Sequence, residues 1–177
     1  MRQNPAGAVA KRFVEGETAD VVITSQPSID SFVQNGKARA ANVAVIARSS
    51  VGVAVKKGAA RPDISSTDAL KRTLLAARSI TYSNPAGGGT SGLHFAKVLD
   101  TLGIAEEMKG RTIFVQSGPV ATLVANGQAE IAVQQMPELV QIEGIEVIGP
   151  LPGSFNLTNV ISAATTATTE HAAASSA

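Results

Sequence analysis

Hydrophobic residues along this chain follow two alternating patterns. Short runs rich in apolar and β-branched residues, typical of strands buried in a sheet, fall at 19–24, 43–46, 51–55, 79–82, 112–115, 130–133 and 145–148. Between these runs, apolar residues recur at helical spacing over 5–15, 27–33, 67–75, 90–102 and 119–124. Strands that alternate with helices predict an α/β fold with mostly parallel sheets and flanking helices.

One segment between a predicted strand and a predicted helix has an unusual composition. Residues 82–92 read Tyr-Ser-Asn-Pro-Ala-Gly-Gly-Gly-Thr-Ser-Gly, and the consecutive glycines let backbone N–H groups turn toward one point. Thr90 or Ser91 then caps the helix, whose first N–H groups lack partners within the helix. Together these features predict an anion-binding site.

The same segment also suggests a nucleotide site. Gly87, Gly89 and Gly92 formally match the dinucleotide pattern G-x-G-x-x-G. The next predicted strand, however, ends in Gln116-Ser117, where that pattern needs an acidic residue for the ribose. A dinucleotide is therefore disfavoured, and a Walker A loop is excluded because neither Gly-Lys-Ser nor Gly-Lys-Thr occurs.

Small polar residues also follow three other predicted strands. They are Thr24-Ser25, Gln116-Ser117-Gly118 and Gln134-Gln135. Ligands of open α/β sheets bind beyond the carboxyl ends of the strands. No Arg or Lys lies in these turns, so an anion would be held by hydroxyls, backbone N–H groups and helix dipoles. The alternative is that each Ser or Thr only caps its own helix.

Composition narrows the possible classes of function. The 177 residues are 44% hydrophobic but only 3% aromatic, so the core must consist mainly of Val, Ile, Leu and Ala. With a net charge of +1 and no basic stripe with interleaved aromatics, nucleic-acid binding is not expected. The lack of cysteine excludes disulfides and thiolate catalysis, and no apolar run is long enough for a membrane span. The first residues do not show the pattern of a signal peptide.

Other candidate chemistry is sparse. His94 follows the glycine segment, where it either packs on the helix or donates a proton to a bound anion. His171 lies in the stretch 163–177, whose Ala, Ser and Thr content predicts a poorly ordered tail. Two histidines so far apart do not form a metal site by spacing, and no Gly-x-Ser-x-Gly elbow occurs. We therefore expect no metal and no cofactor.

Four motifs occur in a specific order and spacing. They are Ala-Asp-Val-Val-Ile at 19–23, Val-Gly-Val-Ala-Val at 51–55, Ser-Asn-Pro with Gly-Gly-Thr-Ser-Gly at 83–92, and Ile-Ala-Val-Gln-Gln at 131–135. Together they resemble the molybdate-type periplasmic solute-binding proteins of ABC transporters, from about residue 6 to residue 151. The resemblance implies the type II periplasmic-binding-protein fold, in which two α/β lobes hold an oxyanion between them. It also implies a periplasmic location, a small anionic ligand and a membrane permease as partner.

The resemblance further implies which residues bind the ligand. Thr24 falls on a ligand-binding serine of the family, Ser91 on a binding position at a helix start, and Ser117-Gly118 near a third. Gln135 falls where molybdate binders have a tyrosine, so we expect a molybdate-like oxyanion or a carboxylate rather than molybdate in particular. The full expected ligand-binding set is Thr24, Ser25, Gly89, Thr90, Ser91, Ser117, Gly118 and Gln135.

Some proteins of this type are aconitate isomerases, which act on a tricarboxylate in the same cleft. An enzyme of that kind is the alternative function, with Tyr82, Ser91 or His94 as candidate proton-handling groups. A third possibility is a non-functional remnant or a protein-interaction module that binds no anion.

The resemblance also implies two lobes of unequal completeness. The second lobe spans 49–149, whereas the first comprises 1–48 and 150–177. The family's first strand and its Gly-Ser/Thr loop have no counterpart in this sequence, so we expect an incomplete, truncated first lobe. Exposed strands there would weaken binding by a monomer and favour self-association.

Overall fold

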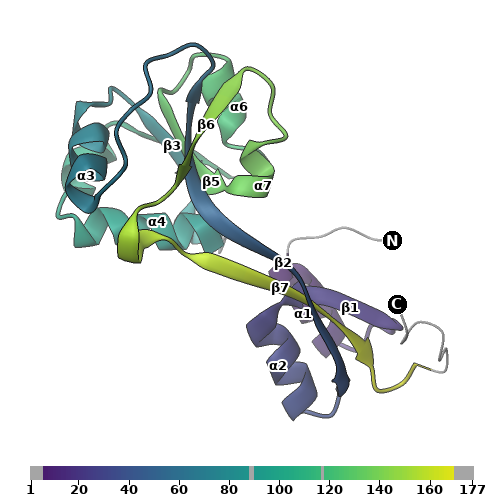
Figure 1. Cartoon of the computed structure of the whole chain (residues 1–177). Coiled ribbons are helices and arrows are strands. Elements are labelled where there is room, and N and C mark those ends of the chain that lie inside the picture. Colours follow the sequence, from purple (N-terminus) through teal and green to yellow (C-terminus); the bar gives the residue numbers. More distant parts are fainter. Residues whose placement is uncertain (1–5, 88–89, 117, 170–177) are drawn as a thin grey trace. The chain divides into compact units, whose positions relative to one another are not determined.

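The chain folds into two compact units, drawn in Figure 1. The computed structural model describes residues 6–87, 90–116 and 118–169. Unit 1 comprises Met1–Ser49 and Asn159–Ala177, and unit 2 comprises Ser50–Thr158. Each unit has a hydrophobic core of its own, so each is described by itself.

Unit 1 is built from strands on which two helices pack. Strand β1 (Val21–Ser25) pairs antiparallel with β7 (Thr158–Thr166), and β7 in turn neighbours β2 (Ala38–Lys56). Helices α1 (Ala6–Val14) and α2 (Gln26–Gln34) contact β1. The core consists of small and medium apolar side chains around one aromatic pair, Phe13 and Phe32, whose ring centroids lie 4.8 Å apart.

Strand β7 corrects one expectation from the sequence. The predicted poorly ordered tail from residue 163 onward is wrong for 163–166, which belong to β7 and of which 163–165 pair with β1, while 170–177 and His171 lie outside the described residues. Thr165 Oγ1 accepts a hydrogen bond of 2.9 Å from Asn42, and Thr166 Oγ1 donates one of 2.6 Å to the carbonyl of Ala19. Both threonines are buried. Their β-branched side chains suit a strand, and their hydroxyls can be buried because each forms a hydrogen bond.

Unit 2 contains a mixed sheet. Its strands are β3 (Ile80–Ser83), β4 (Thr112–Val115), β5 (Ile131–Gln135), β6 (Ile145–Pro150) and residues 50–56 of β2. Strand β3 pairs parallel with β4 and β5, as expected for strands joined through helices, whereas β2 pairs antiparallel with β5 and β6. The connection from β2 to β3 contains a long loop before its helix, which lets the chain reverse direction.

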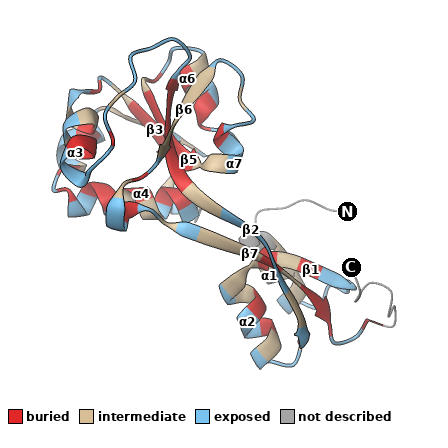
Figure 2. Ribbon diagram, viewed as in Figure 1, coloured by how far each residue is buried: buried red, intermediate tan, exposed pale blue. Residues whose placement is uncertain are grey.

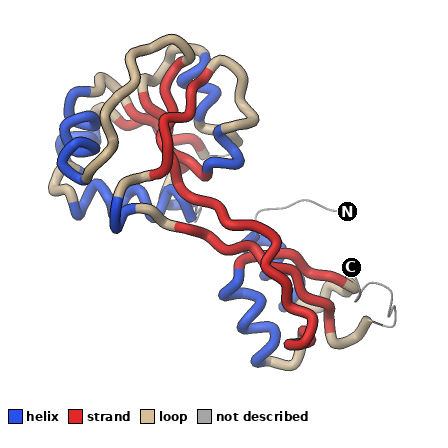
Figure 3. Tube along the Cα trace, in the orientation of Figure 1, coloured by secondary structure: helices blue, strands red, loops and turns tan. Residues whose placement is uncertain are grey.

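Helices lie on both faces of this sheet, as the tube in Figure 3 shows. Along β2 and β5 the side chains alternate between two cores, so Val53 and Val133 belong to one and Ala54 and Ala132 to the other. The first core includes residues of α3 (Thr67–Ala76), α4 (Thr90–Thr101) and α5 (Ala105–Lys109). The second includes residues of α6 (Ala121–Ala125) and α7 (Met136–Leu139).

Burial follows this layering. Figure 2 shows the strands of unit 2 as the most buried part of that unit, with exposed residues on the outer sides of the helices. Leu151 and Phe155, which flank and end the short 3₁₀ turn η2 (Gly153–Phe155), pack in the first core. Residues 150–158, which the sequence analysis grouped with the first lobe, therefore belong to unit 2, where Leu151 and Phe155 are part of its core.

Local sequence signals explain several element ends. The Ser66 side chain accepts a hydrogen bond of 3.1 Å from the Ala69 N–H and so caps α3, as its position predicts. Pro27 lies in the first turn of α2, and Gly103 takes a φ of +67° just after α4 ends. Among the described residues, no helix combines the length and apolar character needed to cross a membrane.

Candidate functional site

The carboxyl ends of three parallel strands lie along one edge of the sheet in unit 2. Ser83 is in register with Val115, and Tyr82 is in register with Val133. The Asn84 N–H donates to the Val115 carbonyl at 2.9 Å, which continues the β3–β4 pairing into the turn. The polar residues that follow β3, β4 and β5 therefore belong to the same edge, as the sequence predicts.

The start of α4 is packed tightly against the end of β3. A Cβ placed on Gly92 would lie only 2.2 Å from the Ser83 carbonyl oxygen, so only glycine permits this approach. The Asn84 side chain accepts from the Ala86 N–H at 3.0 Å and shapes the turn that leads into the 3₁₀ helix η1 (Pro85–Gly87). Gly92, the third glycine of the G-x-G-x-x-G pattern, thus has a clear packing role, whereas Gly89 lies outside the described residues.

Two hydroxyls occupy the first turn of α4. Thr90 is exposed, and Ser91 is buried, with 7% of its surface accessible. Within the described part of the chain, no group forms a hydrogen bond with the Ser91 hydroxyl. A hydroxyl beside the N–H groups of a helix start can donate to an anion.

The end of β5 is held by a hydrogen bond that the sequence analysis missed. Gln134, 4% exposed, accepts from the Val120 N–H at 3.0 Å through its Oε1 atom, at the residue that precedes α6. A protein side chain thus satisfies this N–H, so it is not available to a ligand. Of the predicted pair before α6, Ser117 lies outside the described residues, and Gly118 has a φ of +88° in the turn.

A carboxylate lies near the same edge. Glu138 on α7 has its pKa raised by desolvation, which a hydrogen bond from Gln134 partly opposes. When ionised, the Glu138 carboxylate repels an anion bound close to Gln134 and Gln135, and it disfavours binding of a highly charged anion there. Protonation of Glu138 would remove this repulsion. Gln135 itself is half-buried and begins the turn into α7, where it precedes Met136.

Two predicted ligand-binding residues belong to unit 1. Thr24, 1% exposed, lies in β1 opposite Ser162 of β7. Ser25 precedes α2 without capping it by a side-chain bond, and its hydroxyl lies 2.9 Å from that of Ser28. Their contact with a ligand stays a prediction.

The candidate proton-handling groups at 82 and 94 have structural contacts. The Tyr82 ring is 4% exposed and packs edge-on against Phe95 and Phe114, at 5.0 and 5.1 Å, and desolvation raises its pKa. His94 Nε2 lies 2.8 Å from the Phe155 carbonyl, so in the neutral ring this nitrogen carries the proton and donates. No group of three or more potential metal ligands occurs among the residues described.

Comparisons with known proteins agree with this architecture. A curated relative, an aconitate isomerase from a Pseudomonas species, is 30% identical over 165 residues, which is 93% of this chain and 62% of the relative. A solved substrate-binding domain assigned to a molybdenum ABC transporter of Clostridium difficile is 14% identical, with a TM-score of 0.74 over 97% of this chain and 74% of that chain. The periplasmic molybdate-binding protein of Azotobacter vinelandii is 20% identical, with a TM-score of 0.63 over the same shares.

The structural likenesses confirm the periplasmic-binding-protein fold that the sequence motifs predicted. The model of the family described as bacterial extracellular solute-binding protein matches residues 1–177. Because that match spans the whole sequence, the chain belongs to the family of bacterial extracellular solute-binding proteins.

Proposed function

We propose that this chain binds a small oxyanion or carboxylate, as the solute-binding component of an ABC-type transporter. Ser91 is the observation that carries the proposal. It is buried in the first turn of α4, beside the carboxyl edge of three parallel strands, and its hydroxyl bonds no other described group. Family membership supports the general role, with a periplasmic location and a membrane permease as partner.

The donor chemistry favours a ligand of modest charge. The edge offers hydroxyls and backbone N–H groups but no Arg or Lys in its turns, and Glu138 adds a carboxylate nearby. Neutral donors select by geometry and number rather than by charge alone. Thr24, Ser25, Thr90, Gly118 and Gln135 are the further ligand-binding candidates among the described residues, with Gly89 and Ser117 outside them.

A calorimetric titration of the full chain tests the proposal. The panel is molybdate, tungstate, sulfate, phosphate, citrate and aconitate, and we expect heat of binding with at least one member. Ser91→Ala should lower the affinity for that ligand about tenfold or more, as expected for the loss of a hydrogen bond to a charged group. Ser154→Ala, at an exposed serine elsewhere in unit 2, is the matched control and should leave affinity unchanged. Equal affinities for both variants would refute the role of Ser91.

Isomerisation of aconitate is the second candidate function, and the 30% identity to an aconitate isomerase favours it. Tyr82 and His94 are engaged in packing and in a backbone hydrogen bond, which leaves the Ser91 hydroxyl as the one of the three candidates without a bond to another described residue. NMR of cis-aconitate incubated with the protein tests this function directly. Formation of the trans isomer above the blank would support the enzyme, and its absence at high protein concentration would exclude it.

A further inference from the structure

The turn after β5 brings an amide and a carboxylate together at the edge of the sheet in unit 2. Gln134, at 4% exposure, uses its Oε1 atom to accept from the Val120 N–H at 3.0 Å. Its amide nitrogen is then the group that donates to the Glu138 carboxylate. Both ends of the Gln134 amide are thus engaged, and the carboxylate of Glu138 is held beside the end of β5.

Glu138 has no cationic partner in the part of the chain that the structure describes, since none of the ion pairs there includes it. The strands that α7 contacts are β5, which has no titratable residue, and β6, whose Glu146 pairs with Arg61. Helix α6 on the same face has no titratable residue either. Glu143, in the loop that follows α7, adds a negative charge rather than a positive one. The charge of Glu138 is therefore not neutralised by its surroundings.

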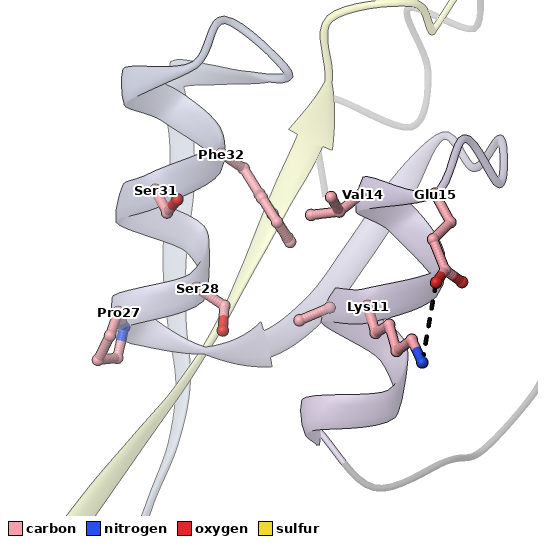
Figure 4. A pocket seen from close by; sticks show the side chains of 8 residues that line it. Lys11, Val14, Glu15, Pro27, Ser28, Ser31 and Phe32 are labelled. Atoms are coloured by element: carbon pink, nitrogen blue, oxygen red, sulfur yellow. Dashed lines mark ion pairs between the residues drawn. The ribbon is translucent and has the colours of Figure 1, made fainter.

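Glu15 of unit 1 shows the contrasting arrangement. It lines the groove between α1 and α2 in Figure 4, where the dashed line marks its ion pair with Lys11 at 3.8 Å on the same helix. Glu138 has instead one neutral donor, Gln134, although a carboxylate has lone pairs for about four hydrogen bonds. Because Glu138 is also exposed, a donor on a ligand can reach it.

Ser91 and Glu138 follow neighbouring strands. Strands β3 and β5 pair side by side, so their ends lie about 4.8 Å apart. The close approach of Gly92 to the Ser83 carbonyl keeps the first turn of α4, and with it Ser91, at the end of β3. The helix start that holds Ser91 is therefore one strand away from the turn that precedes Glu138.

The two side chains suit different groups of one ligand. The Ser91 hydroxyl can donate to an anionic oxygen, whereas an ionised Glu138 only accepts. Molybdate and sulfate have only acceptor oxygens, so an ionised carboxylate nearby repels them. Citrate and hydrogen phosphate each have an O–H group that can donate to Glu138 while other oxygens accept from Ser91.

We propose that Glu138 selects an anion that has its own O–H donor, and excludes anions that have acceptor oxygens only. A site that hydrogen-bonds an O–H group of its ligand rejects analogues without that group, because its own polar group then loses a partner. The inference rests on the proposed function, since it needs a ligand at the edge that holds Ser91.

Two pairs of closely matched anions test the selection by calorimetry on the full chain at neutral pH. Phosphate and sulfate have the same shape, but only phosphate keeps an O–H group. Tricarballylate lacks the hydroxyl of citrate and is otherwise the same tricarboxylate. We expect the member with the O–H group to bind at least about tenfold more tightly in one of the pairs, and that pair tells an inorganic ligand from an organic one.

Glu138→Gln removes the charge but still offers a carbonyl oxygen to Gln134. We expect the preference to fall below about threefold, through tighter binding of the member without the O–H group. Glu143→Gln removes the same charge from an exposed position in the loop after α7, so it is the matched control and should keep the preference. A purely structural role of Glu138 would instead weaken both members of a pair alike.

The pH dependence of sulfate binding gives a second readout, because sulfate stays doubly ionised in mild acid. Desolvation raises the pKa of Glu138, so the carboxylate takes up a proton in mild acid and its repulsion disappears. The affinity for sulfate should therefore rise as the pH falls through the pKa of Glu138. This rise should be absent in Glu138→Gln and present in Glu143→Gln.

The outcomes separate this selection from the proposed function. If none of the four anions bound, both would be overturned. If sulfate and tricarballylate bound as tightly as phosphate and citrate, or if a folded Glu138→Gln kept the preference, only the selection by Glu138 would be overturned. Circular dichroism of both variants shows that they are folded before their affinities are compared.

Discussion

Gly92 lies against the carbonyl oxygen of Ser83, so closely that a Cβ on Gly92 would come within 2.2 Å of it. This contact fixes the first turn of α4 at the end of β3 and thereby sets the position of Ser91. It gives the last glycine of residues 82–92 a purpose that does not involve a nucleotide. The last glycine of the pattern G-x-G-x-x-G is therefore explained by helix–strand packing.

We expect Gly92→Ala to lower the free energy of unfolding by about 1–3 kcal/mol, because the added methyl group forces backbone atoms apart. Urea titration followed by circular dichroism measures the loss. Gly87→Ala is the matched control, since no atom lies within 4 Å of a Cβ built there. If both variants unfold at the same urea concentration, the tight approach of α4 to β3 is wrong.

A substitution of His94 tests whether this side chain serves a structural hydrogen bond or a proton transfer. His94→Phe keeps the ring but removes the donor to the Phe155 carbonyl, so we expect a loss of about 0.5–1.5 kcal/mol in unfolding free energy. Ligand affinity, measured by calorimetry on the folded variant, should not change. Lys97→Gln, on an exposed position of the same helix, serves as the control. A full loss of binding or isomerisation with unchanged stability would instead assign His94 to the site.

The order of elements in unit 2 was largely predictable, because each strand is rich in apolar and β-branched residues that stand out from its flanks. Strand β2 was harder to predict. Arg48-Ser49-Ser50 looks like a break between two strands, yet β2 is continuous through it, since these three positions are exposed or only partly buried and accept polar residues. Strand β7 was missed because Ala, Ser and Thr carry little hydrophobic signal, although their small side chains pack well between β1 and β2.

The candidate site was predictable in outline only. The sequence places polar residues after three strands, and parallel pairing then brings them to one edge. It does not reveal that Gln134 turns inward to bond Val120, because a glutamine at a strand end usually points to solvent. Nor does it reveal the close contact of Gly92, which depends on the distance between two backbones.

Glu130 should make stability depend on pH. Its carboxylate accepts the backbone N–H of Arg78 at 2.6 Å and the Nε of the same residue at 2.8 Å, and these bonds lower the pKa of Glu130. A lowered pKa in the folded state adds stability above the ordinary Glu range, and this stability disappears as the pH falls through the lowered pKa. Glu130→Gln should thus cost about 0.5–1 kcal/mol at neutral pH, since the group is partly exposed.

The difference between the original chain and Glu130→Gln should shrink in acid, which urea titrations at several pH values can measure. Glu106→Gln is the control, because that side chain is 90% exposed and pairs only with Lys109 at 3.7 Å among the described residues. A constant difference across all pH values would show that the carboxylate charge does not matter.

Gln134 offers the sharpest test of how the edge is held together. Gln134→Met keeps the length of the side chain but leaves the Val120 N–H without its acceptor in a buried position, which should cost about 1–3 kcal/mol. Gln128→Met, at an exposed glutamine, should change the unfolding free energy by less than about 0.5 kcal/mol. Equal stability of the two variants would show that the bond to Val120 contributes nothing.

The variant Gln134→Glu keeps a hydrogen-bond acceptor for the Val120 N–H but adds a negative charge near Glu138. The new carboxylate can still accept from Val120, but it would face Glu138, whose own pKa is already raised. Two carboxylates this close cannot both ionise cheaply, so their folded-state pKa values rise, and the stability present in acid is lost as the pH rises through them. We therefore expect Gln134→Glu to be unstable at neutral pH and to recover in mild acid, whereas Gln134→Met stays destabilised at both. If Gln134→Glu lost the same stability at every pH, Glu138 would not face this position.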